Sequence, residues 1–446
     1  MNRNRCALAC ALAFTATGAF AQSSAPNTAV VADTLIQLYG HLDVSIDTAT
    51  KGIKPGDVNT PFGTSTATGK LSWQPSISSN LSYVGLRGGA DLGGGLRAVF
   101  QVETQIDVSA TPGGSVSSSS SDNSVKGALA SRNSYLGLAS PWGAVKVGKT
   151  DAPYKLSTAR MDPFASSVGD YNSIMGNTGG DNRAEFDTRL SHAAWYESPS
   201  FGGFHVDALW APGQNRSTDN SETASGEPNC TGGNTPAAIP STTGTCTDGS
   251  FGTAYSIAAR YEAGPLYLTA AYEKHSGVNR TGDELPPFPA AGAVGVVDEN
   301  AMKAGIQYKL PTNTTLNAIY ERMRRNAPDP NANERQRNGY WLAVTQQIGG
   351  KDDINVGWAH AGKTPGDPSA GPIDNEANMF TVGYKHHFDR RANWYAVYAR
   401  QDNHPGAHYD LGASGHGITT DCHDADGHCF PGKTLQALSV GMQYNF

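Results

Sequence analysis

The segment Leu435-Gln-Ala-Leu-Ser-Val-Gly-Met-Gln-Tyr-Asn-Phe446 alternates apolar and polar residues and stops on an aromatic residue. Its large apolar residues share one face of a strand: Leu438, Val440, Met442, Tyr444 and Phe446. That face suits lipid, and the opposite face of small and polar residues suits water. A chain that stops in the middle of a strand needs a partner at both strand edges, which closure of a β-barrel provides. We therefore predict that Phe446 lies where a barrel closes.

Residues 1–21 have the composition of a secretory signal peptide. Arg3 and Arg5 precede an apolar stretch, and Ala19-Phe20-Ala21 has the small-x-small pattern of a cleavage site before Gln22. We expect residues 22–446 to form the mature protein, a single membrane barrel. Without the two signal-peptide arginines the formal net charge of −7 becomes −9, which argues against a nucleic-acid partner.

The composition excludes a bundle of membrane-spanning helices. After residue 21 there is no run of 18 apolar residues, and hydrophobic residues make up only 38% of the chain. The 52 glycines and 18 tyrosines fit strands that are joined by many turns. If the chain spans a membrane, it does so with strands.

Segments with a two-residue period recur along the mature chain, joined alternately by long polar connections and by short turns such as Ser140-Pro-Trp142. The predicted strands are residues 34–46, 81–88, 96–106, 131–139, 143–149, 191–197, 204–210, 253–261, 266–275, 301–310, 315–324, 339–348, 354–361, 379–387, 393–400 and 435–446. An even number of strands, with short turns at one end and long loops at the other, is typical of bacterial outer-membrane barrels. Sixteen strands also enclose an aqueous lumen. The predicted fold is an all-β, antiparallel transmembrane barrel that forms a pore.

The mature chain resembles the general-diffusion porins of the β-proteobacterial type. The segments that carry the resemblance are Leu38-Tyr-Gly-His-Leu-Asp43, Gly85-Leu-Arg-Gly88, Asp91-Leu-Gly-Gly-Gly-Leu-Arg97, Ser131-Arg-Asn-Ser-Tyr-Leu-Gly-Leu138, Tyr196-Glu-Ser-Pro-Ser-Phe-Gly-Gly203 and the terminal Phe446. The resemblance implies a homotrimer of sixteen-stranded barrels in the outer membrane. It also implies that the third long loop folds into the lumen as a constriction.

Strand alternation assigns a set of basic side chains to the lumen. We name this set the basic wall: Arg87, Arg97, Arg132, Lys146 and Arg189. Tyr39 of the first strand faces the lumen by the same rule. An Arg or Lys that faces lipid at the bilayer midplane costs about 2–4 kcal/mol, which favours the inward assignment. Arg132 is assigned inward with Tyr135 outward, although Arg132 shares its parity with the apolar residues at 136 and 138.

The segment 150–190 is the candidate inward loop, because a connection of this length is usually functional or disordered. It carries Asp162, Asp170 and Glu185 among its acidic residues. By resemblance, an acidic loop edge faces the cluster of Arg87, Arg97 and Arg132 across the pore. Opposed fixed charges screen solutes by charge. We expect a constriction that is weakly selective for anions.

Four cysteines remain in the mature chain, and they favour two local disulfides formed in the periplasm: Cys230 with Cys246, and Cys422 with Cys429. The last loop also holds several histidines, including His404 and His408, so a transition-metal site is an alternative use of the second pair. A disulfide removes the best ligands from such a site. We therefore predict no metal and no cofactor.

The predicted function is passive diffusion of small hydrophilic solutes and ions through an outer-membrane pore of a Gram-negative bacterium. Two alternatives remain open, a substrate-specific channel of eighteen strands and a barrel enzyme. The sequence contains neither Gly-x-Ser-x-Gly nor His-Glu-x-x-His, so no motif supports an enzyme. Three matches to the P-loop pattern, which start at Gly143, Gly357 and Gly427, fall where predicted strands meet long loops and are better explained as rim residues.

Overall fold

The computed structural model describes residues 27–31, 34–54, 56–59, 63–64, 73–109, 129–176, 186–212, 253–278, 297–325, 335–363, 374–412 and 430–446. Most of these residues lie in β-strands. None of the helices among them has the length and hydrophobicity that crossing a membrane needs.

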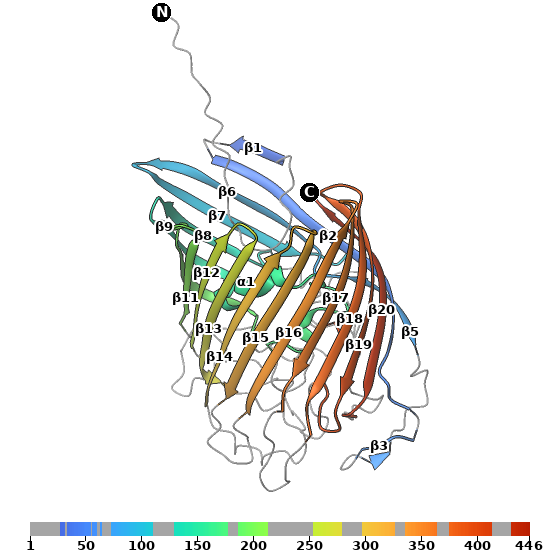
Figure 1. The fold of residues 1–446 in the computed structure, drawn as a ribbon. Coiled ribbons are helices and arrows are strands. Elements are labelled where there is room, and N and C mark those ends of the chain that lie inside the picture. The colour runs from blue at the N-terminus through green and yellow to red at the C-terminus, as the bar shows by residue number, and fades with distance from the viewer. Residues whose placement is uncertain are drawn as a thin grey trace, which may run out of the picture.

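Sixteen antiparallel strands form one closed barrel (Figure 1). Each strand pairs with its neighbour in sequence, and the last strand pairs with the first. The strands are β2 (Thr34–Thr50), β5 (Gln74–Ser79) with β6 (Tyr83–Gly93), β7 (Leu96–Gln105), β8 (Ser134–Ser140), β9 (Gly143–Asp151), β10 (Arg189–Glu197), β11 (Phe204–Ala211), β12 (Thr253–Ala263), β13 (Leu266–Val278), β14 (Val297–Lys309), β15 (Thr314–Arg325), β16 (Arg335–Ile348), β17 (Asp352–Ala361), β18 (Ala377–His387), β19 (Ala392–Asn403) and β20 (Thr434–Asn445). The predicted sixteen-stranded barrel is confirmed, and an eighteen-stranded channel is excluded.

The second barrel strand consists of two segments, β5 and β6, that both pair with β2. Leu81, between them, has a positive φ of 50°, which breaks the strand. The sequence did not predict β5, because Gln74-Pro-Ser-Ile-Ser-Ser79 lacks an alternating apolar pattern. Three short strands complete the sheet assignments. β1 (Asn27–Val31) pairs with the start of β2, and β3 (Val58–Asn59) pairs with β4 (Gly63–Thr64).

The barrel closes where β20 pairs with β2. The backbone N–H of Gly40 donates to the Phe446 carbonyl oxygen at 3.0 Å, and the Phe446 N–H donates to the Gly40 oxygen at 3.1 Å. A Cβ at Gly40 would lie only 2.4 Å from the Phe446 ring, so this close approach requires glycine. Asp43 ties the same seam together, because its carboxylate accepts hydrogen bonds from Tyr395 on β19 and Gln443 on β20, each at 2.8 Å.

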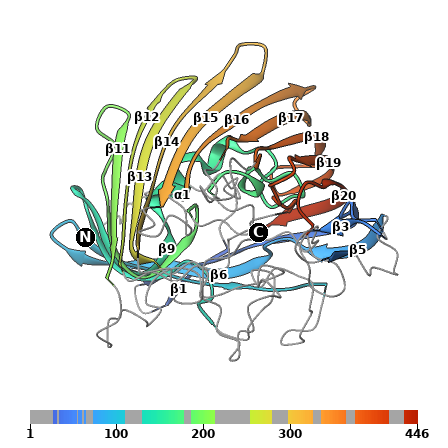
Figure 2. The same cartoon turned by 90° about the horizontal axis from the view of Figure 1, so that it is seen from below.

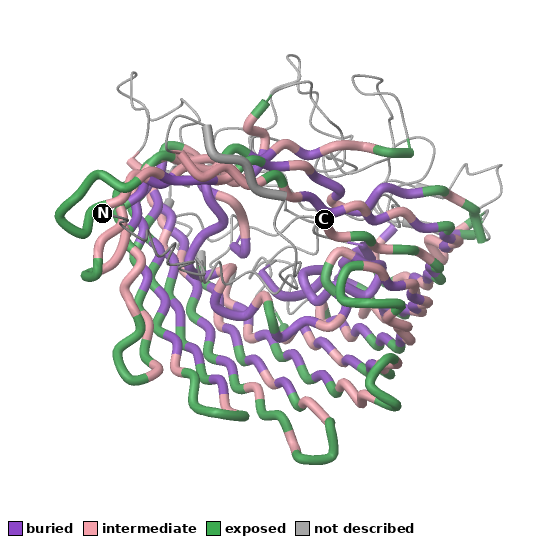
Figure 3. Tube along the Cα trace, turned by 90° about the horizontal axis from the view of Figure 1, so that it is seen from above, coloured by how far each residue is buried: buried purple, intermediate pink, exposed green. Residues whose placement is uncertain are grey.

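Buried and exposed residues alternate along the strands, which separates the inner from the outer face (Figure 3). On β15 the inward Ile319, Glu321 and Met323 are buried, whereas Tyr320 and Arg324 between and beyond them are exposed. This is the two-residue period on which the sequence prediction rested. The outer face is mostly aliphatic and aromatic, as a lipid-facing surface requires.

The strands are joined by short turns at one end of the barrel (Figure 1), and the longer connections begin and end at the opposite ends of the same strands. Between β9 and β10 the chain forms α1 (Pro153–Thr158), the 3₁₀ helix η2 (Ala159–Met161) and a second 3₁₀ helix, η3 (Tyr171–Ser173). Proline at the first helical position of α1 has its φ angle already set for a helix. Figure 2 shows this segment inside the ring of strands.

Candidate functional site: the inner loop and the basic wall

Residues 152–176, which we name the inner loop, pack against the inner face of the barrel. The Tyr154 N–H donates to Ser256 Oγ on β12 at 2.9 Å. The indole N–H of Trp341 on β16 donates to the Met161 carbonyl oxygen at 3.1 Å. Because these strand side chains belong to the buried set, the inner loop lies on the lumen side of β12–β16.

A buried aromatic contact holds the middle of the inner loop. Phe164 is 2% exposed, and its ring lies edge to face with Trp341 at a centroid distance of 6.2 Å. The ring also covers two glycines, since a Cβ at Gly357 on β17 or at Gly383 on β18 would lie 2.9 Å from it. The two glycines therefore create the space that the ring fills.

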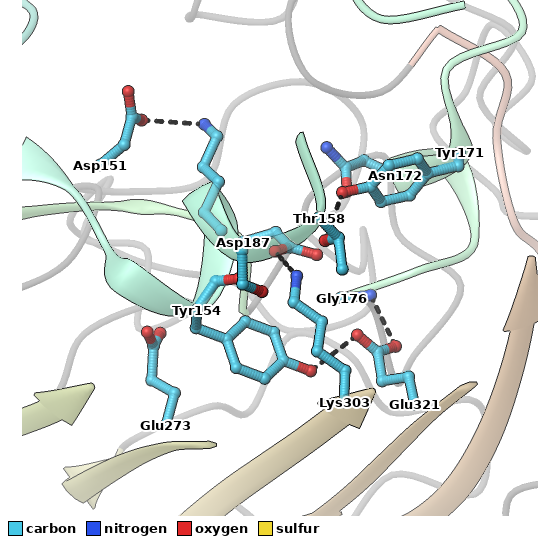
Figure 4. Close-up of polar contacts among 12 residues, drawn as sticks. Asp151, Tyr154, Thr158, Tyr171, Asn172, Gly176, Asp187, Glu273, Lys303 and Glu321 are labelled. Carbon is cyan, nitrogen blue, oxygen red and sulfur yellow. Dashed lines mark hydrogen bonds and ion pairs between the residues drawn. The ribbon is translucent and has the colours of Figure 1, made fainter. Parts of the chain in front are cut away.

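Charged and polar contacts hold the two ends of the loop (Figure 4). Lys303 of β14 forms an ion pair with Asp187, just before β10. Glu321 of β15 accepts hydrogen bonds from the Tyr154 hydroxyl at 2.8 Å and from the Gly176 N–H at 2.9 Å. Burial raises the pKa of Asp187 to about 6, and the nearby ammonium group of Lys303 acts in the opposite direction. These contacts join both ends of the connection to the same two strands.

A second buried cluster lies beside this anchor. His275 of β13 contacts Glu299 through Nδ1 at 2.6 Å and Glu273 through Nε2 at 2.9 Å. The ring of Phe186 stacks on the imidazole at a centroid distance of 4.7 Å. All of these side chains are almost fully buried, so the cluster supports the wall and does not line the pore. The sequence pattern did not single it out, although His275 and Glu273 share one strand face.

Three of the five basic-wall residues are paired with carboxylates of the same wall. The pairs are Arg132 with Glu103 (2.5 Å), Lys146 with Glu197 (2.7 Å) and Arg189 with Asp151 (3.3 Å). The cations in these pairs are largely buried. Each pair joins strands or turns that are neighbours in the barrel, and each carboxylate compensates the positive charge of its partner. None of these pairs was predicted from the sequence.

Arg87 and Arg97 differ from the other three. In the described part of the chain neither forms an ion pair with a carboxylate. Arg87 Nε donates to Gln37 Oε1 at 2.9 Å, and its guanidinium lies over the Tyr39 ring at 4.9 Å. The Tyr39 hydroxyl in turn donates to Glu103 at 3.0 Å. The uncompensated positive charge of the basic wall is therefore at Arg87 and Arg97, on β6 and β7.

The structure corrects the expected face of Tyr135. Its ring stacks edge to face with Trp195 at 5.4 Å and carries the Lys146 ammonium 4.6 Å from its centroid, so it points inward. Arg132 is also inward: it lies in the bend directly before β8, is buried, and its Nε donates to Glu103 Oε1 at 2.5 Å. The alternation of β8 does not extend through this turn to residue 132.

Asp162 and Asp170 are turned into the inner loop itself. Asp162 accepts hydrogen bonds from the backbone N–H groups of Phe164 at 2.9 Å and Tyr171 at 3.1 Å, and Asp170 accepts one from Asn172 at 2.9 Å. Among the described residues, neither carboxyl contacts an arginine of the basic wall. Burial raises the pKa of both, for Asp162 with a further contribution from Asp170, and that of Asp170 to about 6. The carboxyl groups of Asp162 and Asp170 therefore stabilise turns within the inner loop.

Other predicted residues lie outside the described part of the chain. These are Glu185, the signal peptide at 1–21, and the four cysteines Cys230, Cys246, Cys422 and Cys429. Of the P-loop matches, the one that starts at Gly143 lies within β9, so it has no phosphate-binding loop between a strand and a helix.

A closed barrel of sixteen strands with a polar, charged interior defines a channel protein of the outer membrane. The model of the Gram-negative porin family matches residues 7–406, so the chain belongs to this family. It is an outer-membrane channel for passive diffusion.

Several relatives support this assignment. An outer membrane porin protein of Bordetella pertussis is 25% identical over 391 residues, which cover 82% of this chain and 89% of the relative. The outer membrane porin protein 32 of Delftia acidovorans is 22% identical over 428 residues, which cover 94% and 96% of the two chains. Among solved structures, an anion-selective porin from Comamonas acidovorans superimposes with a TM-score of 0.65 at 18% identity, over 93% of this chain and all of that one.

Proposed function

We propose that this porin is a weakly anion-selective diffusion pore and that Arg87 and Arg97 set its preference. The observation that carries the proposal is the pairing within the basic wall, in which carboxylates compensate Arg132, Lys146 and Arg189 but not the other two. A fixed positive charge at the edge of an aqueous pore raises the local concentration of anions. Because carboxylates compensate three of the five cations, the net positive charge of the basic wall is small, which explains why the preference for anions is weak.

The inner loop narrows the pore in this proposal. It fills the space next to β12–β18 with a packed core around Phe164 and Trp341, so the open path runs along the opposite wall, past Tyr39 and Arg87. Solutes then pass within reach of the uncompensated charge. The porin from Comamonas acidovorans is described as anion-selective, which is the same sign of charge selectivity that we propose for this protein. The proposed activity is passage of small hydrophilic solutes and ions and includes no chemical step.

The test compares two charge changes in the same wall. The change Arg87→Gln with Arg97→Gln removes two uncompensated charges, and we expect the chloride-to-potassium permeability ratio to fall to one or below. The control, Lys146→Gln with Glu197→Gln, removes a pair that is already neutral, and we expect the ratio to stay at the wild-type value. Zero-current potentials in a potassium chloride gradient across a planar bilayer measure both. An unchanged ratio in the first variant contradicts the proposal.

We also propose that the protein forms a homotrimer through the outer surface of β2–β9. The exposed large side chains on these strands are aliphatic, for example Leu38, Leu86 and Val147. The exposed aromatic side chains of the described strands all lie on β10–β20: Tyr196, Phe204, Trp210, Tyr255, Tyr272, Tyr308, Tyr320, Tyr340, Phe380 and Tyr444. On the β2–β9 side the exposed aromatic residues are Trp73, directly before β5, and Trp142, in the turn between β8 and β9, and both lie outside the strands. Aromatic residues mark surfaces that meet the lipid headgroups, so their scarcity on this side favours contact with protein there.

Native mass spectrometry in a mild detergent tests the assembly. Val147→Gln on β9 should reduce the trimer fraction, whereas Val356→Gln on β17, at a similarly exposed lipid-facing position, should not. A monomeric wild-type protein refutes the homotrimer.

We further propose that residues 1–21 are a cleaved signal peptide and that the four remaining cysteines form two disulfides. N-terminal sequencing of the mature protein should start at Gln22. The disulfides Cys230–Cys246 and Cys422–Cys429 should appear as two cross-linked peptides in a non-reducing digest.

A further inference from the structure

A histidine and two carboxylates from two different long connections meet at the loop end of β18 and β19. Asp374 and Glu376 lie directly before β18, and His404 lies directly after β19. The backbones of the two connections are joined by hydrogen bonds. The His404 N–H donates to the Glu376 carbonyl oxygen at 3.0 Å, and the Gly406 N–H donates to the Asp374 carbonyl oxygen at 2.7 Å. The backbone therefore holds the three residues together independently of their side chains.

The three side chains converge at distances that suit a bound metal ion. His404 Nδ1 lies 2.9 Å from Asp374 Oδ1 and 3.9 Å from Glu376 Oε2, and one ligand atom of each residue lies within 4.8 Å of the other two. In a tetrahedral site with metal–ligand bonds of about 2.0–2.2 Å, neighbouring ligand atoms are about 3.4 Å apart. The observed distances lie on both sides of this value. Because the three side chains are between 37% and 50% exposed, small rotations can bring them around an ion that enters from the outer solution.

The charge of this group favours a cation. Among the described residues, no lysine or arginine forms an ion pair with Asp374 or Glu376. One imidazole therefore faces two carboxylates, so the group is negatively charged even when His404 is protonated. At the short-turn end of the barrel, His386 contacts only the single carboxylate of Asp352, at 2.7 Å. The second carboxylate distinguishes the group at the loop end from an ordinary pair of histidine and aspartate.

The ligand types indicate which class of ion fits. Imidazole nitrogen together with carboxylate oxygen is a donor set that suits zinc and similar first-row transition metals. Calcium takes about six to eight oxygen ligands, and magnesium prefers oxygen ligands in octahedral geometry. A site with one nitrogen donor and two carboxylates therefore fits zinc better than either of these ions.

His404 is the first residue of a segment that folds inward, residues 404–412, which we name the cap segment. Tyr409 and Leu411 are buried in the same cluster as Phe164 of the inner loop. Asn403 fixes the backbone of the segment, because its side chain accepts from the Tyr409 N–H at 3.1 Å and donates to the Tyr409 carbonyl oxygen at 2.9 Å. The cap segment is therefore packed into the core that holds the inner loop, and His404 is where it leaves the barrel wall.

We propose that Asp374, Glu376 and His404 bind a divalent transition-metal ion of the zinc class, and that this ion fastens the start of the cap segment to the connection before β18. The ion replaces the hydrogen bond between the His404 imidazole and the Asp374 carboxylate and brings Glu376 into the same contact. This site differs from the cysteine-containing one considered from the sequence, and it revises the expectation that the protein binds no metal. His404 was noted in the sequence, but its two partners are 28 and 30 residues away, so the pattern did not connect them.

The experiment titrates zinc sulfate into the intact porin in detergent and follows binding by isothermal titration calorimetry. The wild type should bind one equivalent of zinc that His404→Gln and Glu376→Gln each bind at least about 10- to 100-fold more weakly, since even the outer partners of metal ligands contribute that much. His386→Gln is the matched control, because it removes an imidazole that faces only one carboxylate, and it should bind as the wild type does. His416, His423 and His428 of the last loop are retained in every variant, so binding there cannot produce the difference.

Hydrogen exchange of the cap segment tests the fastening. If opening of the segment separates His404 from the two carboxylates, zinc at about 100 times its Kd should reduce that opening about 100-fold. Exchange of the backbone amides of residues 406–412 should therefore slow in the wild type and stay unchanged in His404→Gln.

Three results would each overturn the proposal. They are equal zinc binding by His404→Gln or Glu376→Gln, calcium binding as tight as that of zinc, and exchange in the cap segment that zinc does not slow.

Discussion

Removal of the Phe164 side chain should release the inner loop from the barrel wall while the barrel itself stays intact. The ring is 2% exposed, contacts Trp341 and covers Gly357 and Gly383. A Phe-to-Ala change at a buried position costs about 3–5 kcal/mol. Since about 1.4 kcal/mol corresponds to a tenfold change in an equilibrium, the detached population of the loop should rise about 100-fold to a few thousand-fold. The hydrogen bonds between the strands do not involve this side chain.

Single-channel recordings in planar bilayers measure this effect. Phe164→Ala should add openings of higher conductance and increase the current noise, because the detached loop no longer narrows the pore. Phe388→Ala is the matched control, since that ring is 52% exposed in the turn after β18. Gly383→Ala should reproduce the effect by placing a Cβ 2.9 Å from the Phe164 ring. Combined with Phe164→Ala it should add little, because the clash is then gone. Traces identical to the wild type in amplitude and noise would refute the reasoning.

Three further predictions concern the seam, the anchor and pH. A Cβ at Gly40 would already lie 2.4 Å from the Phe446 ring, so the side chain of Gly40→Val should clash with that ring. The variant should therefore show a smaller fraction of heat-resistant folded barrel on cold gel electrophoresis. A fraction equal to that of the wild-type protein contradicts this prediction. Lys303→Met leaves Asp187 buried without its cation and should cost about 3–5 kcal/mol in denaturant unfolding, whereas Lys303→Met with Asp187→Leu should recover most of it. Burial raises the pKa of Asp170 in the folded protein to about 6, above the value near 4 that it has in the unfolded chain. The protonated carboxyl group therefore stabilises the folded loop fully below about pH 4, and this stabilisation is lost as the pH rises through about 6. Loop noise in bilayer recordings should therefore increase from pH 4 to pH 7, and Asp170→Asn should flatten that increase; a pH profile that does not change in the variant counts against the assignment.

The strands were predictable because a barrel wall imposes a two-residue period on every segment that has lipid on one side and water on the other. The expected segments 253–261 and 393–400 coincide with the first parts of β12 and β19 to within a residue, for example. The period failed where the backbone leaves the extended conformation. β5 contains a proline and one large apolar residue, and Arg132 lies in a bend directly before β8, outside the alternation of that strand.

The pairing of charges was less accessible to sequence reasoning. A short turn fixes the register of a hairpin, so positions across β8 and β9 follow from the sequence. β9 and β10 are joined by the long connection that contains the inner loop, so their register does not follow from turn geometry. The contact between Lys146 and Glu197 depends on that register. The same holds for Asp162 and Asp170, whose hydrogen bonds depend on turns within the loop.

The most direct test of the central claim is the current through the purified wild-type protein in a planar bilayer with a tenfold gradient of potassium chloride. We predict stepwise conductance increments and a zero-current potential of the sign that chloride preference produces, small in magnitude because most of the basic wall is compensated. Absence of stepwise channels, or a potential of the opposite sign, would contradict it.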